Sequence, residues 1–282
     1  MADVQSPTVR RRRLGQELRR LREGAKLTID EVAQRLEVSP AKISRIERGR
    51  VSVRPRDVSD LLDQYEIQGS QRDNLLTLTR EARQQGWWHS YDDVLSEGTD
   101  TFVGLEAEAE AIRLYEVQFV PGLLQTSEYA RAIIGAHYRS EKPEQIERRV
   151  ELRMARQQLV IEQNNTRVWA VLDEAVLRRH MGPPEVMQSQ YRRLLEFSEM
   201  KNVTIQVSPL DIGVYSGVPV GFAIMQLPRP DPQVVVIEYR GGVLYIEKSE
   251  DVTMHADMFD LMIANAKGPE ESITYISKLA VE

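Results

Sequence analysis

The sequence contains no cysteine among its 282 residues. This absence excludes disulfide bonds, iron–sulfur clusters, thiolate zinc sites and a cysteine nucleophile. Only four histidines occur, and no two of them have the spacing of metal ligands on one helix face, so we expect no metal site. No apolar run approaches the roughly 18 residues of a membrane helix, and no apolar stretch of signal-peptide type follows the basic N-terminal residues. We therefore expect a cytoplasmic protein that does not enter a membrane.

Charge is distributed unevenly along the chain. Residues 1–85 hold 18 Lys and Arg against 13 Asp and Glu, whereas residues 86–282 hold 19 against 30. A basic segment followed by an acidic one suggests that the first part meets a polyanion, and a solvated charged surface is the alternative. The length exceeds that of a usual domain of roughly 100–200 residues. We therefore expect two domains, 1–85 and 86–282.

The first domain carries the pattern of several short helices. Apolar residues recur at helical spacing in a first helix, at Leu14, Leu18 and Leu21. A second helix begins with a capping box, in which Thr28 and Glu31 satisfy each other's backbone N–H groups. Ser39 and Pro40 then begin a third helix as its cap and its first residue, and Gly49 ends it. Two short helices joined by a tight turn form a helix-turn-helix arrangement.

The third helix, which we place at about 39–48, has an outer face without acids. Its side chains there are Ala41, Lys42, Ser44, Arg45 and Arg48. The helix N-terminus adds partial positive charge and free N–H groups for phosphate. Arg45 is long enough to reach a base edge, where a bidentate contact to guanine is the commonest specific contact. Arg50, Arg54 and Arg56 follow directly and suit phosphates of the flanking strand.

Residues 27–49 resemble the XRE-type helix-turn-helix of phage repressors and Cro proteins, in the pattern Leu27-Thr28-x-x-Glu31-Val32-Ala33-x-x-Leu36-x-Val38-Ser39-x-x-x-Ile43-Ser44-x-Ile46-Glu47-x-Gly49. The resemblance extends over residues 10–83 and implies an all-α, five-helix, lambda-repressor-like DNA-binding domain. A generic helical bundle with a basic face is the alternative. By position, the resemblance implies that Pro40, Ala41 and Arg45 read bases, and that Arg22 and Glu47 form an internal, structural ion pair. The expected DNA-binding residues are Thr28, Ser39, Pro40, Ala41, Lys42, Ser44, Arg45, Arg48, Arg50, Arg54 and Arg56.

The second domain mixes helical and strand patterns, so we expect a larger α+β domain. We expect a helix at 101–116 with Glu106, Glu108 and Glu110 on its solvent side. The further expected helices are at 143–163, 174–180, 184–200, 250–266 and 269–280. The expected strands are at 168–172, 203–207, 219–227, 233–239 and 243–247.

Residues 115–130 carry a second specific pattern, Tyr115-Glu116-x-x-x-Val120-Pro121-Gly122-Leu123-Leu124-Gln125-Thr126-x-x-Tyr129-Ala130. With further matches at 153–157, 171–178 and 217–222, it resembles the WhiJ-like regulators of actinomycetes, in which an XRE-type domain precedes a C-terminal domain of unknown function. The resemblance implies transcription regulation and a possible small BldB-like protein partner. It implies no activity for the C-terminal domain.

Two interpretations of the segment 121–126 stay open. Pro121, Leu123, Leu124 and Gln125 could form a partner-binding loop with apolar anchors. The segment could equally be a tight turn that packs its leucines into the core, with Thr126 as the cap of the next helix.

Catalytic chemistry has little support in the second domain. Asp173 and Glu174 stand at the end of an expected strand, where catalytic acids can lie, but acids at a helix N-terminus are the alternative. Gly213, Gly217 and Gly221 lack the spacing of a phosphate-binding loop, so we expect no cofactor. The sequence has no cysteine, clustered histidines or nucleophile motif, and we do not expect an enzyme.

These patterns predict a sequence-specific DNA-binding transcription regulator, such as a repressor, that acts at the nucleoid. Because one helix-turn-helix offers few base contacts, we expect a homodimer on an inverted repeat of double-stranded DNA. The second domain then serves dimerisation or binds a small partner protein or ligand. The alternative function is an antitoxin-like module that holds the small BldB-like partner, with DNA binding serving autoregulation.

Overall fold

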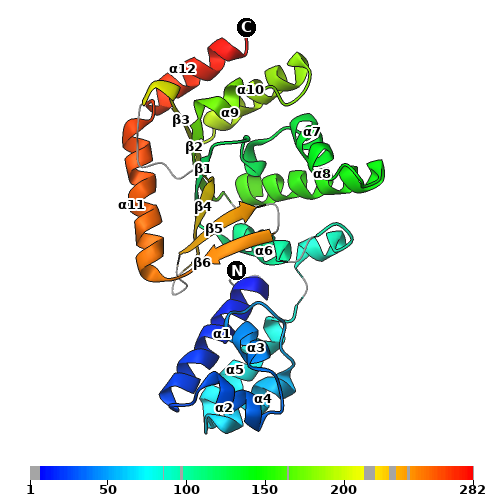
Figure 1. Cartoon of the computed structure of the whole chain (residues 1–282), viewed down its shortest axis with the longest axis vertical. Helices are drawn as coiled ribbons and strands as arrows, with labels where there is room; N and C mark the ends of the chain where they lie inside the picture. The colour runs from blue at the N-terminus through cyan, green and yellow to red at the C-terminus, as the bar shows by residue number, and fades with distance from the viewer. Residues whose placement is uncertain are drawn as a thin grey trace. The chain divides into compact units, whose positions relative to one another are not determined.

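Five helices follow one another in the first part of the chain, and a mixed sheet with surrounding helices forms the second (Figure 1). The structure is a computed structural model that describes residues 7–84, 86–95, 98–163, 165–212, 220–228, 233–239 and 242–281. The chain divides into two units, which we call the head (Met1–Ser90 with Val103–Glu108) and the body (Tyr91–Phe102 with Ala109–Glu282). The expected fold class, an all-α domain followed by an α+β domain, is confirmed.

One apolar core joins the five helices of the head. Leu18, Val32 and Leu62, from three different helices, are fully shielded from solvent in it. A further helix, α6 (Thr99–Glu108), contributes its second half to the head. The five helices are α1 (Pro7–Gly24), α2 (Ile29–Arg35), α3 (Pro40–Glu47), α4 (Pro55–Gln64) and α5 (Gly69–Glu81).

Two glycines allow the end of α3 to lie directly on α1. A Cβ atom at Gly15 would lie 2.5 Å from the carbonyl oxygen of Glu47, which is closer than atoms can approach. Gly49 has a φ of +64°, and a Cβ there would lie 2.7 Å from the Cα of Arg12. Gly49 is predicted from the sequence as a helix end, whereas Gly15 is a mid-helix glycine whose function is this close approach.

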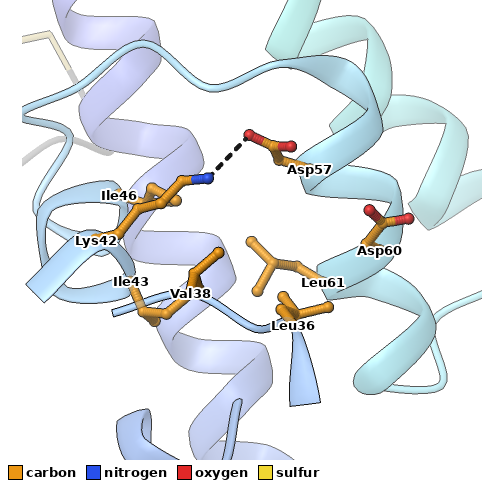
Figure 2. A pocket seen from close by; sticks show the side chains of 8 residues that line it. All are labelled: Leu36, Val38, Lys42, Ile43, Ile46, Asp57, Asp60 and Leu61. Atoms are coloured by element: carbon orange, nitrogen blue, oxygen red, sulfur yellow. Dashed lines mark ion pairs between the residues drawn. The ribbon is translucent and has the colours of Figure 1, made fainter. Parts of the chain in front are cut away.

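A small pocket of about 60 Å³ lies between α3 and α4 (Figure 2). Apolar side chains line it, among them Val38, Ile43 and Leu61. Lys42 and Asp57 close it with their polar ends, as Figure 2 shows. The pocket therefore lies beside the outer face of α3.

The body is built around a six-stranded mixed sheet with the strand order β3-β2-β1-β4-β5-β6 (Figure 1). β1, β2 and β3 pair in parallel, and β1 pairs antiparallel with β4, which begins an antiparallel meander. β1 is therefore the strand at which the parallel half meets the antiparallel half. The strands are β1 (Ala111–Glu116), β2 (Arg167–Asp173), β3 (Val203–Ser208), β4 (Phe222–Gln226), β5 (Val234–Tyr239) and β6 (Gly242–Ile246).

Helices cover both faces of this sheet, with α11 on one side and α7 and α8 on the other (Figure 1). On the α11 side, Phe259 packs against Tyr115, Phe222 and Val235 of three strands. On the other side, helices occupy the crossovers between the parallel strands, as parallel pairing requires. The helices of the body are α7 (Ser127–His137), α8 (Pro143–Gln157), α9 (Glu174–Arg178), α10 (Pro184–Ser198), α11 (Ser249–Asn265) and α12 (Pro269–Leu279).

The expected helix at 101–116 is wrong in its second half. Helix α6 ends at Glu108, and residues 111–116 form strand β1 at the centre of the sheet. Ile112 and Leu114 are buried and alternate with the less buried Arg113, which is the two-residue period of a strand. Glu106, which we expect on the solvent side, is only 3% exposed, because α6 is buried on nearly all sides from residue 101 to 106.

The other expected helices and strands of the body are confirmed within a few residues at their ends. The helix expected at 143–163 consists of α8 followed by a wider π-helical turn, Gln158–Gln163. Gly213, Gly217 and the first residue of the strand expected at 219–227 lie outside the described residues. No helix in the described ranges has both the length and the apolar character needed to cross a membrane.

Candidate nucleic-acid interface

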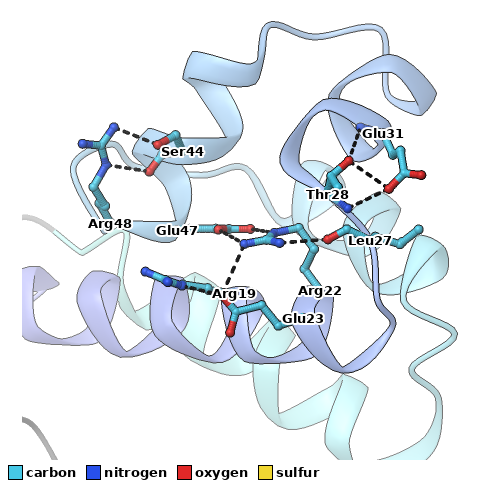
Figure 3. Close-up of polar contacts among 9 residues, drawn as sticks. All are labelled: Arg19, Arg22, Glu23, Leu27, Thr28, Glu31, Ser44, Glu47 and Arg48. Atoms are coloured by element: carbon cyan, nitrogen blue, oxygen red, sulfur yellow. Dashed lines mark hydrogen bonds and ion pairs between the residues drawn. The ribbon is translucent and has the colours of Figure 1, made fainter.

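Helix α2 begins with the capping box that the sequence predicts. The hydroxyl of Thr28 accepts a hydrogen bond from the backbone N–H of Glu31 at 3.2 Å, and the Glu31 carboxylate accepts from the backbone N–H of Thr28 at 2.7 Å (Figure 3). The Thr28 hydroxyl also donates to that carboxylate at 2.8 Å. Thr28 is exposed, but Glu31 already engages its hydroxyl as donor and as acceptor.

The turn after α2 sets the direction in which α3 begins. Glu37 in this turn has a φ of +53°, in the left-handed region that closes a helix. Ser39 then caps α3, because its hydroxyl accepts from the backbone N–H of Lys42 at 3.2 Å. Pro40 occupies the first helical position, where its missing N–H costs nothing. Both Ser39 and Pro40 are exposed.

Arg22 and Glu47 form a buried ion pair between α1 and the end of α3 (Figure 3). Nε and Nη2 of Arg22 donate to the two carboxylate oxygens of Glu47 at 2.6 and 2.9 Å. Nη1 of Arg22 also donates to the carbonyl oxygen of Leu27 at 2.8 Å, just before α2. The hydrogen bonds that Arg22 donates to Glu47 raise the pKa of Arg22, so the guanidinium stays charged. This pair fixes α1, α3 and the start of α2 relative to one another.

The outer face of α3 combines free and engaged side chains. Arg45 is exposed, and its side chain has no hydrogen bond or ion pair to another described residue. Arg48 folds back along the helix, where Nη2 donates to the hydroxyl of Ser44 at 2.8 Å and Nε to its carbonyl oxygen at 3.1 Å (Figure 3). Ala41 is exposed beside them. The exposed residues of α3 include no acid, because Glu47 points inward.

Lys42 is engaged by an acid that the sequence does not predict as part of the site. Its Nζ lies 3.5 Å from a carboxylate oxygen of Asp57, in the first turn of α4 (Figure 2). The only signal for Asp57 in the sequence is an acid in the first turn of a helix, which is common for electrostatic reasons alone.

Three further basic residues follow α3, on the connection and at the start of α4. Arg50, Arg54 and Arg56 are exposed, and their side chains have no partner among the described residues. Arg54 is the N-cap residue of α4, without a side-chain cap hydrogen bond, and Arg56 lies in its first turn. The contact between Lys42 and Asp57 brings this turn next to α3. The basic residues of 42–56 therefore lie on α3, on the connection after it and on the start of α4.

In the body, the segment 121–126 has its side chains inside the domain. Pro121, Leu123, Leu124 and Gln125 are all buried, with Leu124 completely so. Thr126 caps α7, because its hydroxyl accepts from the backbone N–H three residues later at 3.2 Å. The structure therefore has the tight turn that packs its leucines into the core, and a role of these four residues in binding a partner stays a prediction.

Three buried glutamines hold the backbone of this segment. The amide of Gln190 donates to the carbonyl oxygen of Leu124 at 2.7 Å and accepts from the N–H of Thr126 at 2.8 Å. Gln157 donates to the carbonyl oxygens of Gly122 and Gln125 at 2.9 and 2.6 Å. Gln125 itself donates to a carbonyl oxygen five residues earlier at 2.6 Å. We call these three residues the glutamine clamp.

The two acids at the end of β2 have structural partners. Asp173 caps α9 by accepting from a backbone N–H at 2.9 Å. Glu174 accepts from Nε of Arg178 at 2.6 Å and from the hydroxyl of Tyr275 at 2.7 Å. Burial opposes its ionisation, but these hydrogen bonds lower the pKa of Glu174. In the described parts of the chain, no three His, Cys, Asp or Glu side chains are close enough to share a metal ion.

Glu116 stands apart because it makes no hydrogen bond to a described residue. It ends β1, and a Cβ atom at Gly221, just before the neighbouring strand β4, would lie 2.7 Å from its carboxylate. Burial raises the pKa of Glu116 to about 8, the negative charge of Glu238 adds to this effect, and the positive charge of Arg153 opposes it.

Comparison with known proteins yields two family matches. No curated protein and no solved structure matches the chain significantly. A model described as "Helix-turn-helix domain" matches residues 13–75, which include α2, the turn and α3. Helix-turn-helix domains bind DNA, so this match indicates DNA binding and transcription regulation rather than catalysis. A model described as "Domain of unknown function (DUF5753)" matches residues 99–278, which is more than half of the chain, and the chain therefore belongs to the DUF5753 family.

Proposed function

We propose that this protein is a sequence-specific transcription regulator whose helix α3 enters the major groove of double-stranded DNA. The observation that carries the proposal is the outer face of α3, which follows a helix-turn-helix turn, contains no exposed acid and presents Arg45 without a partner among the described residues. An arginine in this position can donate two hydrogen bonds to one guanine. Arg45 is therefore the proposed base-reading residue.

The remaining basic residues are proposed to contact phosphates. Arg50, Arg54 and Arg56 stand exposed between α3 and the first turn of α4. The capped N-terminus of α3 adds backbone N–H groups and partial positive charge. Contacts of this kind position a protein on the duplex without reading its sequence.

A homodimer on an inverted repeat is the proposed binding form. One head offers Arg45 and the apolar side chains of Pro40 and Ala41 to the bases, which is too little for tight and specific binding alone. Two heads on half-sites about one helical turn apart combine both sets of contacts. The body, whose sequence is strongly acidic, is proposed to supply the dimer contact and not a DNA contact.

DNA capture tests this function. The full chain is mixed with sheared genomic DNA at about 0.15 M salt, the retained fragments are sequenced, and Arg45→Ala is treated in parallel. Arg80→Ala, which removes an exposed arginine from α5, is the matched control. Enrichment of a short inverted repeat by the wild type and by Arg80→Ala, lost in Arg45→Ala, is the expected result.

Retention of random fragments only, equally by all three proteins, contradicts sequence-specific regulation. The alternative function, an antitoxin-like module that holds a small BldB-like partner, loses its residue-level support at 121–125, because those side chains are buried. Membership of the narrower WhiJ-like group of regulators is also proposed, and the patterns at 115–130, 153–157, 171–178 and 217–222 support it.

A further inference from the structure

The contact between Lys42 and Asp57 opposes the charge pattern of the surface around it. Among the expected DNA-binding residues, all of which the structure describes, Lys42 is the one whose cation is paired with an acid. Both ends of the pair reach solvent, since the side chains of Lys42 and Asp57 are 42% and 35% exposed. A phosphate at this surface would therefore meet a cation that already has an anionic neighbour.

The surroundings of Lys42 favour this contact in the absence of DNA. Its aliphatic stem lines the pocket between α3 and α4 together with Val38 and Leu61, and Figure 2 shows its Nζ directed toward Asp57. Apolar walls commonly hold the stem of a lysine while its charged end stays in water. Asp60, one turn further along α4, lines the same pocket but makes no ion pair with the residues drawn in Figure 2.

In an ion pair of this kind, another anion can easily replace Asp57 as the partner of Lys42. An ion pair open to solvent contributes little to stability, because water screens the attraction and two long side chains must be held in place. A DNA phosphate offers Lys42 the same charge and releases counterions on contact. The phosphate replaces Asp57 only where the DNA backbone is correctly placed against α3. Elsewhere Lys42 stays with Asp57, and the carboxylate repels nearby phosphates.

We propose that Asp57 competes with DNA phosphate for Lys42 and so weakens binding to random DNA more than binding to the specific site. Asp57 then acts as a specificity-determining residue that works through Lys42. The inference rests on the proposed function, because it concerns the regulation of the same DNA-binding surface. Two simpler roles of Asp57 make different predictions: an acid that stabilises the N-terminus of α4, and a general negative charge near DNA.

Binding to a random-sequence duplex separates these possibilities. The full-length wild type, Lys42→Gln, Asp57→Asn and the double variant are titrated with labelled duplex between 50 and 200 mM salt, and binding is followed by fluorescence anisotropy. Asp60→Asn is the matched control, because it removes the same charge from the same helix without touching Lys42.

Asp57→Asn is expected to bind the random duplex about fivefold more tightly at 150 mM salt. Its log–log salt slope is expected to steepen by about 0.9, which corresponds to one more phosphate contact. Asp60→Asn is expected to gain at most about twofold, and so is Asp57→Asn in the Lys42→Gln background. On the specific duplex recovered by DNA capture, Asp57→Asn is expected to gain only about twofold.

Equal gains for Asp57→Asn and Asp60→Asn overturn the inference in favour of general charge. A gain that persists without Lys42 overturns it as well. Unfolding cannot imitate the expected result, because an unfolded head loses affinity. Wild-type protein that binds no DNA overturns the proposed function and this inference together, whereas wild-type binding with no coupling between Lys42 and Asp57 overturns the inference alone.

Discussion

The head and the body bury polar groups in different ways. The head buries a charged pair, Arg22 with Glu47, in which each side chain is less than a tenth exposed. The body buries neutral amides, the glutamine clamp, which bind the backbone of residues 120–126. The charged pair fixes helices relative to one another, whereas the amides bind a backbone whose regular structure is a single short 3-10 turn, Gly122–Leu124. Buried charge thus sets the orientation of helices in the head, and buried amides hold a mostly irregular segment in the body.

Removing one charge from the head is expected to have the largest effect. Glu47→Gln leaves the guanidinium of Arg22 buried without its counterion, and we expect a loss of about 3–5 kcal/mol in the free energy of unfolding of the head. Hydrogen exchange of the α1–α3 amides measures this, separately from the sheet amides. Glu17→Gln, which removes an acid of α1 that pairs with the exposed Arg20 and not with Arg22, is the control and is expected to leave exchange unchanged. Equal exchange in both variants contradicts a special role for the buried pair.

Opening the glutamine clamp is expected to cost less than breaking the charged pair. Gln190→Ala leaves the carbonyl oxygen of Leu124 and the N–H of Thr126 without partners, and we expect a loss of about 2–3 kcal/mol. Exchange of the β1 and α7 amides reports it. Gln188→Ala, an exposed glutamine on the same helix, is the control. If Gln190→Ala lowers the free energy of unfolding as much as Glu47→Gln does, the buried amides of the body and the buried ion pair of the head do not differ in their contribution to stability.

Glu116 offers a test of what a carboxyl group without a hydrogen bond to a described residue does in the body. Because its folded pKa of about 8 lies above the ordinary value of 4.5, the folded protein holds a proton that the unfolded chain releases, and stability falls as pH rises between these values. Glu116→Gln cannot ionise and should escape this fall. We expect the free energy of unfolding of Glu116→Gln to exceed that of the wild type by about 1–3 kcal/mol at pH 8 and by little at pH 5. Denaturant unfolding at both pH values measures this difference. If the difference in stability between Glu116→Gln and the wild type is the same at both pH values, the raised pKa of Glu116 is contradicted.

The smallest effect is expected at the surface of the head. Arg54→Ala should weaken binding across DNA sequences and make the log–log salt slope shallower by about one, because one phosphate contact is lost. Arg139→Ala makes the same charge change on the body and should leave the slope unchanged. Equal salt slopes for Arg54→Ala and Arg139→Ala would show that Arg54 does not contact a phosphate.

The two units also differ in how far their sequences predict them. The helix starts of the head follow from local chemistry, because Thr28, Glu31 and Ser39 bond to backbone groups within three residues. The strands β2 to β6 are visible as apolar runs. β1 is missed because it follows an acid-rich helix after only two residues, and its pairing with β2 and β4 is set by residues far away in the sequence.

The candidate site is predicted in part. The position of Arg45 on exposed surface follows from helical spacing, and Arg54 and Arg56 are expected there because they follow the third helix directly. The engagement of Lys42 by Asp57 does not, because it joins two helices across a turn whose geometry the sequence leaves open. The sequence does not predict the glutamine clamp either, because glutamine is usually exposed and no local pattern indicates a buried one.

The place of β1 in the sheet has a consequence for the order in which the body assembles during synthesis. β1 pairs on one side with β2 and on the other with β4, whose residues Phe222–Gln226 leave the ribosome about 110 residues later. At about 5–20 residues per second this delay lasts on the order of 5–20 s. During that time the edge of β1 that later pairs with β4 has no native neighbour. The charged Arg113 at the middle of β1 disfavours pairing of this edge with a wrong strand. The meander β4-β5-β6, which spans residues 222–246, leaves the ribosome within a few seconds. Because its strands pair with near neighbours in the sequence, it then completes the sheet as a local unit.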